Sequence, residues 1–216
     1  MYITYLGHSC FKLEGKETQA VLITDPYDKS VGLRVPKMVA DIVTISHNHK
    51  DHSNVSNVSA ATGDVFVIDS PGEYEVKKVF VYGMPSYHDN AGGKERGENI
   101  IYRIEMDGIS FAHLGDLGHL LNGSALEKLE GVDVLFVPVG GKYTLDAKEA
   151  SQLISSIEPR IVIPMHYKTE GIILDIDGVD KFLKEMGTAK TEPVDKLKLV
   201  EKDLPQGVME VVVMAP

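Results

Sequence analysis

The segment "SHNHKDH", residues 46–52, places three histidines and one aspartate in a single short stretch of chain. It follows "DIVTI", residues 41–45, a β-branched run that predicts a buried strand. The histidine-rich segment therefore begins where a strand ends. Side chains two positions apart in an extended chain point to the same side, so His47 and His49 can reach one point in space. This spacing indicates a metal-binding loop.

Two further donors in the same segment, Asp51 and His52, come from its next turn and point toward a neighbouring position. Imidazole nitrogens and carboxylate oxygens are both common metal ligands. A solvated polar loop rarely needs three histidines so close together, which makes chance the poorer explanation. The geometry suits a pair of metal ions.

The composition is that of an acidic globular protein. Its 32 acidic and 22 basic residues give a formal net charge of -10, which argues against a non-specific nucleic-acid binder. A small anionic substrate is still compatible with this charge, because bound divalent cations reverse the sign locally. The single cysteine, Cys10, excludes an internal disulfide and fits a reducing compartment.

The first residues, "MYITYLGHSC", lack the basic and apolar regions of a signal peptide. No apolar run of the sequence approaches the length of a membrane span. We therefore expect a cytoplasmic protein without a membrane partner.

Strands are predicted along the whole chain, and helices mainly in its later part. Apolar runs separated by turn residues predict strands over residues 1–7, 10–14, 20–26, 41–45, 65–69, 77–83, 100–106, 109–115, 132–139, 160–166, 196–202 and 208–214. Helices are predicted over residues 125–130, 146–157 and 179–187, with weak helical character over 52–62. The segment "SPGEYE", residues 70–75, is predicted to form a turn.

Local signals support several of these boundaries. Asp107-Gly108 is a strong hairpin signal, Asp146 and Glu149 are spaced as a helix capping box, and Gly187 predicts a helix end. The sequence shows no linker or tandem repeat, so we expect one domain over residues 1–216. Strand-rich segments followed by helices predict two sheets packed together and covered outside by helices.

Three isolated donors, His88, Asp116 and His166, each follow a predicted strand. Taken alone, a histidine at a strand end is more often a surface or core residue than a ligand, and Asp116 between glycines could simply form a turn. Considered together, the three residues are better candidates for metal ligands, because a metal pair needs more ligands than residues 46–52 supply. Loops at one edge of a sheet are where such sites are usually built.

The order and spacing of these donors resemble the metallo-β-lactamase superfamily. Asp25 in "TDP" matches an early acidic motif of that family, and "GHSCF", "PGEYEV", "GDLGH" and "IPMHY" resemble its small hydrolase branch, which is similar to L-ascorbate-6-phosphate lactonase. The resemblance implies an α/β fold, an αβ/βα sandwich of two mixed β-sheets flanked by helices, with metals at one edge. The chain is short for the extra segments of the lactonase, so the lactonase substrate is not carried over.

Carried over residue by residue, the resemblance implies two metal positions that share one carboxylate. The first metal would be held by His47, His49 and His88. The second would be held by Asp51, His52 and His166. Asp116 would bridge both metals, and Asp25 would support a ligand or the loop through hydrogen bonds.

The remaining histidines have less defined roles. His113 and His119 flank Asp116, where one of them could line the pocket as a proton donor or hold the bridging carboxylate, and we place His113 with Asp25 among the supporting residues. Packing in the loop without a chemical role is an equal alternative for both. We expect His8 to be structural or to lie at the rim of the site. Four residues after late strands could contact a substrate oxyanion: Lys142, Tyr143, Tyr167 and Lys168.

The donor set indicates two divalent metal ions per chain. Neutral imidazoles with a few carboxylates suit zinc, and manganese or iron also accept such ligands. The flavodiiron branch of the family has a glutamate where this chain has His49, which counts against a redox diiron site.

The function predicted from these residues is that of a binuclear metal-dependent hydrolase. A metal-bridging hydroxide would attack a small ester, lactone or phosphodiester, and Asp51 would be the catalytic residue that accepts the proton. One alternative is a nuclease of the same superfamily, although no basic run for RNA or DNA is present. Another is a non-catalytic metal-binding protein. The sequence leaves a homo-oligomer open.

Overall fold

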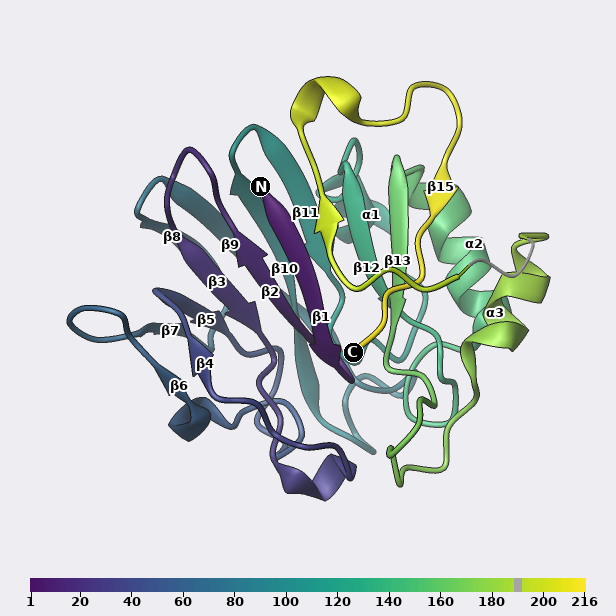
Figure 1. Ribbon diagram of the computed structural model, residues 1–216. Helices are drawn as coiled ribbons and strands as arrows, with labels where there is room; N and C mark the ends of the chain where they lie inside the picture. The colour runs from purple at the N-terminus through teal and green to yellow at the C-terminus, as the bar shows by residue number, and fades with distance from the viewer. Residues whose placement is uncertain (189–191) are drawn as a thin grey trace.

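The computed structural model describes residues 1–188 and 192–216, which form two β-sheets packed face to face (Figure 1). One sheet has the order β14-β1-β2-β3-β5-β7, with bounds Leu197–Lys198, Tyr2–Gly7, Cys10–Glu14, Val21–Thr24, Ile42–Thr44 and Phe66–Ile68. The other has the order β15-β13-β12-β11-β10-β9-β8, with bounds Glu210–Val211, Ile161–Met165, Val134–Pro138, Ile109–His113, Glu98–Met106, Val79–Tyr87 and Gly72–Val76. A small parallel pair joins β4 (Met38–Val39) to β6 (Val58–Ser59).

Both sheets combine antiparallel and parallel pairing. In the first sheet β1, β2 and β3 are antiparallel, whereas β3, β5 and β7 are parallel. In the second sheet β8 to β11 are antiparallel, whereas β11, β12, β13 and β15 are parallel. The carboxyl ends of parallel strands meet at one edge of a sheet, which is where ligands bind in such folds. The loops after β3 and β5, and those after β11 and β13, therefore gather at one edge of their sheet.

Aromatic side chains fill the space between the sheets. Phe11 of β2 and Phe136 of β12 are fully buried, and their ring centroids lie 4.3 Å apart. The Tyr102 hydroxyl of β10 lies 2.8 Å from the carbonyl oxygen of Ile45 and 2.9 Å from that of Ile68. This contact fixes the residue that precedes the histidine-rich segment against the opposite sheet.

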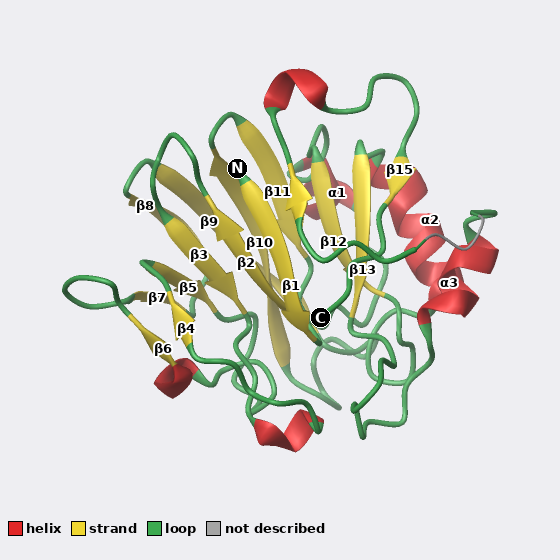
Figure 2. Cartoon of the chain, in the orientation of Figure 1, coloured by secondary structure: helices red, strands yellow, loops and turns green. Residues whose placement is uncertain are grey.

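The helices are α1 (Gly123–Glu127), α2 (Ala147–Ile157) and α3 (Val179–Glu185), with short 3₁₀ helices at Lys29–Val31, Val55–Asn57 and Glu201–Asp203. Figure 2 shows α2 and α3 side by side, beside the part of the second sheet that carries β13. The predicted capping box is present, because the Asp146 carboxylate accepts from the Glu149 N–H at 2.8 Å and the Glu149 carboxylate accepts from the Asp146 N–H at 3.1 Å. Gly187, with φ of 63°, follows α3 as expected.

Two local predictions are wrong. Residues 70–75, predicted as a turn, enter β8, in which Glu73 and Glu75 point outward while Tyr74 and Val76 are half-buried in the pairing with β9. Residues 52–62, predicted with weak helical character, form only the 3₁₀ helix at 55–57 and β6, because their apolar side chains pack beneath the first sheet.

The predicted fold class, two mixed sheets with flanking helices, is confirmed. Within the described part of the chain, no helix has both the length and the apolar character needed to cross a bilayer.

Candidate metal centre

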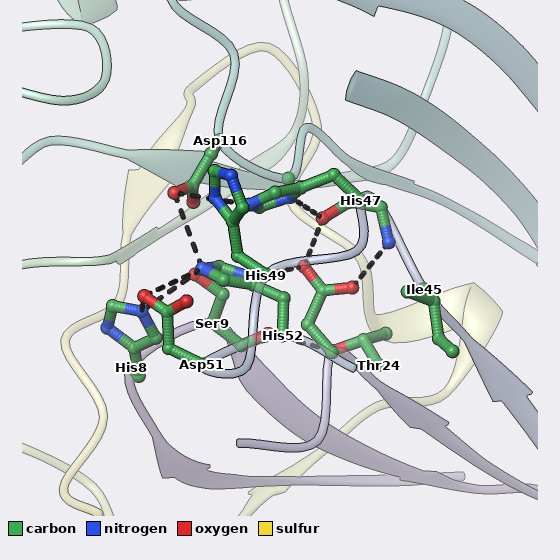
Figure 3. A network of polar contacts seen from close by, with 12 residues as sticks. His8, Ser9, Thr24, Ile45, His47, His49, Asp51, His52 and Asp116 are labelled. Carbon is green, nitrogen blue, oxygen red and sulfur yellow. Dashed lines mark hydrogen bonds and ion pairs between the residues drawn. The ribbon is translucent and has the colours of Figure 1, made fainter. Parts of the chain in front are cut away.

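Histidines and aspartates from five loops converge at one edge of the sandwich. Figure 3 shows His47, His49, Asp51 and His52 of the histidine-rich segment facing His8 and Asp116. Three groups have ligand atoms that all lie within 4.8 Å of one another: His47, His49 and His88; His47, His52 and Asp116; and His8, His52 and His166. All seven predicted metal ligands lie in this cluster or against it, with Asp51 in contact with His8 and His52.

Asp116 lies at the centre of the cluster. Its Oδ2 atom is 3.2 Å from the Nε2 atoms of both His88 and His166, and 3.3 Å from His52 Nε2. The same oxygen is 4.0 Å from His47 Nε2. One carboxylate oxygen therefore touches histidines of different donor groups, which is the geometry expected of a bridging ligand.

The turn after β11 presents Asp116. Gly115 has φ of 56°, and a Cβ atom there would lie 2.4 Å from the Asn99 side-chain oxygen and 2.5 Å from Ser46 Cβ. That same Asn99 oxygen accepts a hydrogen bond from the Asp116 N–H at 2.9 Å. Glycine is therefore required at 115, and Asn99, which is not among the predicted site residues, holds the turn.

Asp25 forms hydrogen bonds with the start of the histidine-rich segment. Its carboxylate accepts from the Ser46 N–H at 2.7 Å and the Ser46 hydroxyl at 2.6 Å, and lies 2.9 Å from His52 Nδ1. Ser46 Oγ in turn lies 2.9 Å from His47 Nδ1. Carboxylates commonly fix the orientation of ligating imidazoles in this way. Asp25 thus turns the Nε2 atom of His52 toward Asp116.

The charges of the cluster are arranged for a cation. Burial alone would raise the pKa of Asp116, but His166 and His52 lower it well below its ordinary value. Burial lowers the pKa of His47 to about 3, so its imidazole is neutral. Among the described residues, the buried atoms His47 Nε2 and Asp116 Oδ1 have no hydrogen-bond partner. The neutral His47 imidazole, the ionised Asp116 carboxylate and the buried atoms without hydrogen-bond partners fit metal binding.

A family model with the description "Beta-lactamase superfamily domain" matches residues 2–166. The chain belongs to the metallo-β-lactamase superfamily. A UPF0173 metal-dependent hydrolase of Methanoregula boonei is 31% identical over 201 residues, which cover 82% of this chain and 87% of that protein. A second, from Thermococcus onnurineus, is 28% identical over 192 residues and covers 77% of this chain and 84% of that protein.

A solved structure is also similar. The crystal structure of a candidate Zn-dependent hydrolase of the metallo-β-lactamase superfamily from Thermotoga maritima has a TM-score of 0.79 at 38% identity, covering 99% of this chain and 97% of that chain. The superfamily and the enzyme class predicted from the sequence, a metal-dependent hydrolase, are thereby confirmed. The likeness to the lactonase branch stays a prediction.

His8, for which the sequence predicted a structural role or a position at the rim, lies in one of the donor groups. The metallo-β-lactamase fold buries it completely, with Nε2 at 3.1 Å from His52 Nε2 and 3.4 Å from Asp51 Oδ2. Its carbonyl oxygen accepts from the His166 N–H and from the Tyr5 hydroxyl, each at 2.8 Å. His8 follows a predicted strand, as His88 and His166 do, and this shared position was the signal that could have found it.

The other two histidines pack against backbone. His113 is fully buried, with Nε2 at 2.9 Å from the Ser9 carbonyl oxygen, and its Nδ1 accepts from the Gly115 N–H at 3.3 Å. It therefore supports the turn that carries Asp116. His119 accepts from the Tyr87 N–H at 3.3 Å, outside the donor groups.

The donors open into a cavity of about 340 Å³, lined by His49, Asp51, His88, Arg96, Asp116, Tyr143, His166 and Leu174. Of the four predicted substrate contacts, only Tyr143 lines it. The Lys142 ammonium pairs with Asp175, and Lys168 donates to the Leu174 carbonyl oxygen at 2.7 Å. Tyr167 is buried, and its hydroxyl donates to the Met214 carbonyl oxygen at 3.3 Å.

Proposed function

We propose that this protein is a binuclear metal-dependent hydrolase that acts on a small ester, lactone or phosphodiester. The observation that carries the proposal is the position of Asp116 Oδ2, in contact with His88 of one donor group and His166 of another. A structural metal site closed by four ligands has no need of a carboxylate shared in this way.

The donors divide into two sets around that carboxylate. His47, His49 and His88 would hold the first ion. Asp51, His52 and His166 would hold the second, with His8 beside them. Such a donor set suits zinc and accepts manganese or iron. When bound, two divalent ions lower the pKa of a shared water and polarise the bond to be cleaved.

Asp51 has the position of a proton acceptor. Its side chain is 26% exposed and lines the cavity, whereas Asp116 is buried. Burial opposes ionisation of Asp51, but hydrogen bonding to His8 and the proximity of His52 lower its pKa below the ordinary value. An ionised carboxylate facing the cavity can take the proton released during hydrolysis.

A small substrate fits this chain better than RNA or DNA. The cavity at the donors has a volume of about 340 Å³, and the net charge of -10 repels a long polyanion over most of the surface. The nuclease alternative therefore lacks the basic surface that it would need.

Elemental analysis of metal-saturated protein tests the proposal. We expect about two transition-metal ions per chain, about one in His47→Ala and about one in His166→Ala. Asp51→Asn keeps the side-chain shape but removes the charge, so its loss of activity on a panel of lactones and phosphodiesters should be larger than its loss of metal. A wild-type protein that binds only one ion at saturation would rule out the binuclear site.

A further inference from the structure

The loop between β9 and β10, residues 88–97, places the positively charged side chain of Arg96 at the wall of the metal-centre cavity. Arg96 lines this cavity with the candidate ligands His49, Asp51 and His88. Its Nη1 atom lies 3.7 Å from Glu95 Oε2, beyond hydrogen-bond distance, and the Glu95 side chain is 63% exposed. In the part of the chain that the structure describes, the guanidinium donates no hydrogen bond. Its N–H groups are therefore available to a ligand.

The loop holds Arg96 in a fixed place. The buried Asp89 carboxylate accepts hydrogen bonds of 2.8 to 2.9 Å from four backbone N–H groups of the loop, those of Ala91, Gly93, Glu95 and Arg96. The base of the loop closes where the His88 N–H donates to the Gly97 carbonyl oxygen at 3.1 Å. The backbone of Arg96 is thus positioned relative to the candidate ligand His88, so the loop need not be ordered when Arg96 binds a partner.

Tyr143 supports the guanidinium from its face. The Arg96 Cζ atom lies 5.8 Å from the centre of the Tyr143 ring, within the range of a cation–π contact. A guanidinium stacked on a ring keeps its in-plane N–H groups free, and these match the two oxygens of a carboxylate or phosphate. Lys142 lies 5.7 Å from the same ring, but Asp175 already neutralises it.

The charge around Arg96 selects the side on which an anion would bind. Arg96 also lines a second cavity of about 550 Å³, and that cavity contains the carboxylates of Asp69 and Glu98. The cavity at the metal centre contains Asp51 and Asp116, which the proposed ions would neutralise. An anionic group is therefore disfavoured in the larger cavity and favoured between Arg96 and the ions.

We propose that Arg96 binds an anionic group of the substrate, a carboxylate or a phosphate, while the bond to be cleaved lies at the metal centre. This inference rests on the proposed hydrolase function and narrows its substrates to small molecules that carry an oxyanion. The sequence predicted contact with a substrate oxyanion for Lys142 and Lys168. The proposal assigns this contact to Arg96, which lies in a different loop.

Calorimetric titration of the metal-loaded protein with dicarboxylates tests the subsite without any turnover. Malonate, succinate, glutarate and adipate vary the spacing between one carboxylate for the ions and one for Arg96, and each is compared with the monocarboxylate of equal chain length. At the best spacing we expect the dicarboxylate to bind about tenfold more tightly than the monocarboxylate, as a charge-assisted bidentate contact would provide. The advantage should disappear in Arg96→Gln and be reduced in Arg96→Lys.

Lys94→Gln is the matched control, because it removes the same charge from an exposed position of the same loop that lines neither cavity. It should keep the full advantage of the dicarboxylate. Replacing succinate by 3-phosphonopropionate shows whether the loss at Arg96→Gln is larger for a carboxylate or for a phosphate-like group. Wild-type protein with no preference for any dicarboxylate, or an equal loss of preference in Lys94→Gln, would overturn the subsite. Failure to bind two ions is a separate result, measured by elemental analysis, and would overturn the hydrolase proposal instead.

Discussion

The two histidine groups of the metal centre are built in different ways. In the group of His47, His49 and His88, His49 is exposed and two of the three residues line the cavity. In the group of His8, His52 and His166, no residue is more than 1% exposed. The His8 ring lies 4.8 Å from the His52 ring and 4.3 Å from the His166 ring. The first group therefore has an exposed donor at the cavity, His49, whereas the second group is buried throughout, although His166 also lines the cavity.

This difference in burial predicts that the two groups contribute differently to folding stability, although both contribute to metal binding. An exposed donor contributes little to folding, because its contacts are made largely with water. Buried imidazoles must be satisfied by neighbours, and their removal disturbs packing and hydrogen bonding together. Damage at the exposed His49 should appear in metal binding alone, and damage to the second group in metal binding and in stability.

Asp116→Ala should have the largest effect, because it removes a carboxylate that contacts histidines of both groups. We expect loss of both ions and a fall of hydrolytic activity to background, measured by elemental analysis and by the substrate panel. Asp64→Ala, which removes a carboxylate from an exposed loop, is the control and should behave as wild type. Retention of two ions by Asp116→Ala would show that the groups bind metal independently.

The next largest effects separate the two groups. In metal-free protein, His49→Ala should change the free energy of unfolding by less than about 0.5 kcal/mol, whereas His8→Ala should lower it by about 1–3 kcal/mol. Each variant should also bind metal more weakly than wild type. Urea denaturation of the metal-free proteins and metal titration measure both properties. Equal stabilities of the two variants would abolish the distinction between the groups.

Most of the site could be predicted from sequence because most of its donors obey one local rule. His47, His88, Asp116 and His166 each lie just after a strand, and parallel strands bring their carboxyl ends to one edge. His8 obeys the same rule, but its burial depends on the hydrogen bond between its carbonyl oxygen and the His166 N–H. A contact between residues so far apart in the chain has no local signal.

The loop that carries Arg96 shows a second limit. Its shape depends on one carboxylate, Asp89, which accepts hydrogen bonds from four backbone N–H groups. A side-chain carboxylate that accepts from backbone N–H groups in this way leaves no spacing pattern in the sequence. The turn predicted at residues 70–75 fails for a related reason, since the Pro-Gly signal outweighed the alternation of the strand that follows it.

A smaller effect is expected at Asp25, which supports both groups through His52 and Ser46 without lying in either. Asp25→Asn should weaken metal binding roughly 10- to 100-fold, as loss of a carboxylate behind a ligating histidine usually does. Asp28→Asn, three residues along, changes a half-buried cap of a 3₁₀ helix outside the donor groups and should bind metal normally. Metal titration against a competing chelator compares the two variants. Wild-type affinity in Asp25→Asn would mean that the packing of His52 alone fixes its orientation.

The smallest effect is expected at Asp146, which caps α2 outside both groups. Asp146→Ala should lower the free energy of unfolding by about 1 kcal/mol, because the Glu149 N–H loses its acceptor. The neighbouring Leu145 N–H donates to the Leu117 carbonyl oxygen at 3.0 Å, next to Asp116. That bond is made by backbone, so truncation of the Asp146 side chain should leave the turn at Asp116 and the metal affinities unchanged. If metal affinity fell together with stability, the metal centre would depend on α2. The difference in burial between the two histidine groups would then not be enough to explain how the centre is stabilised.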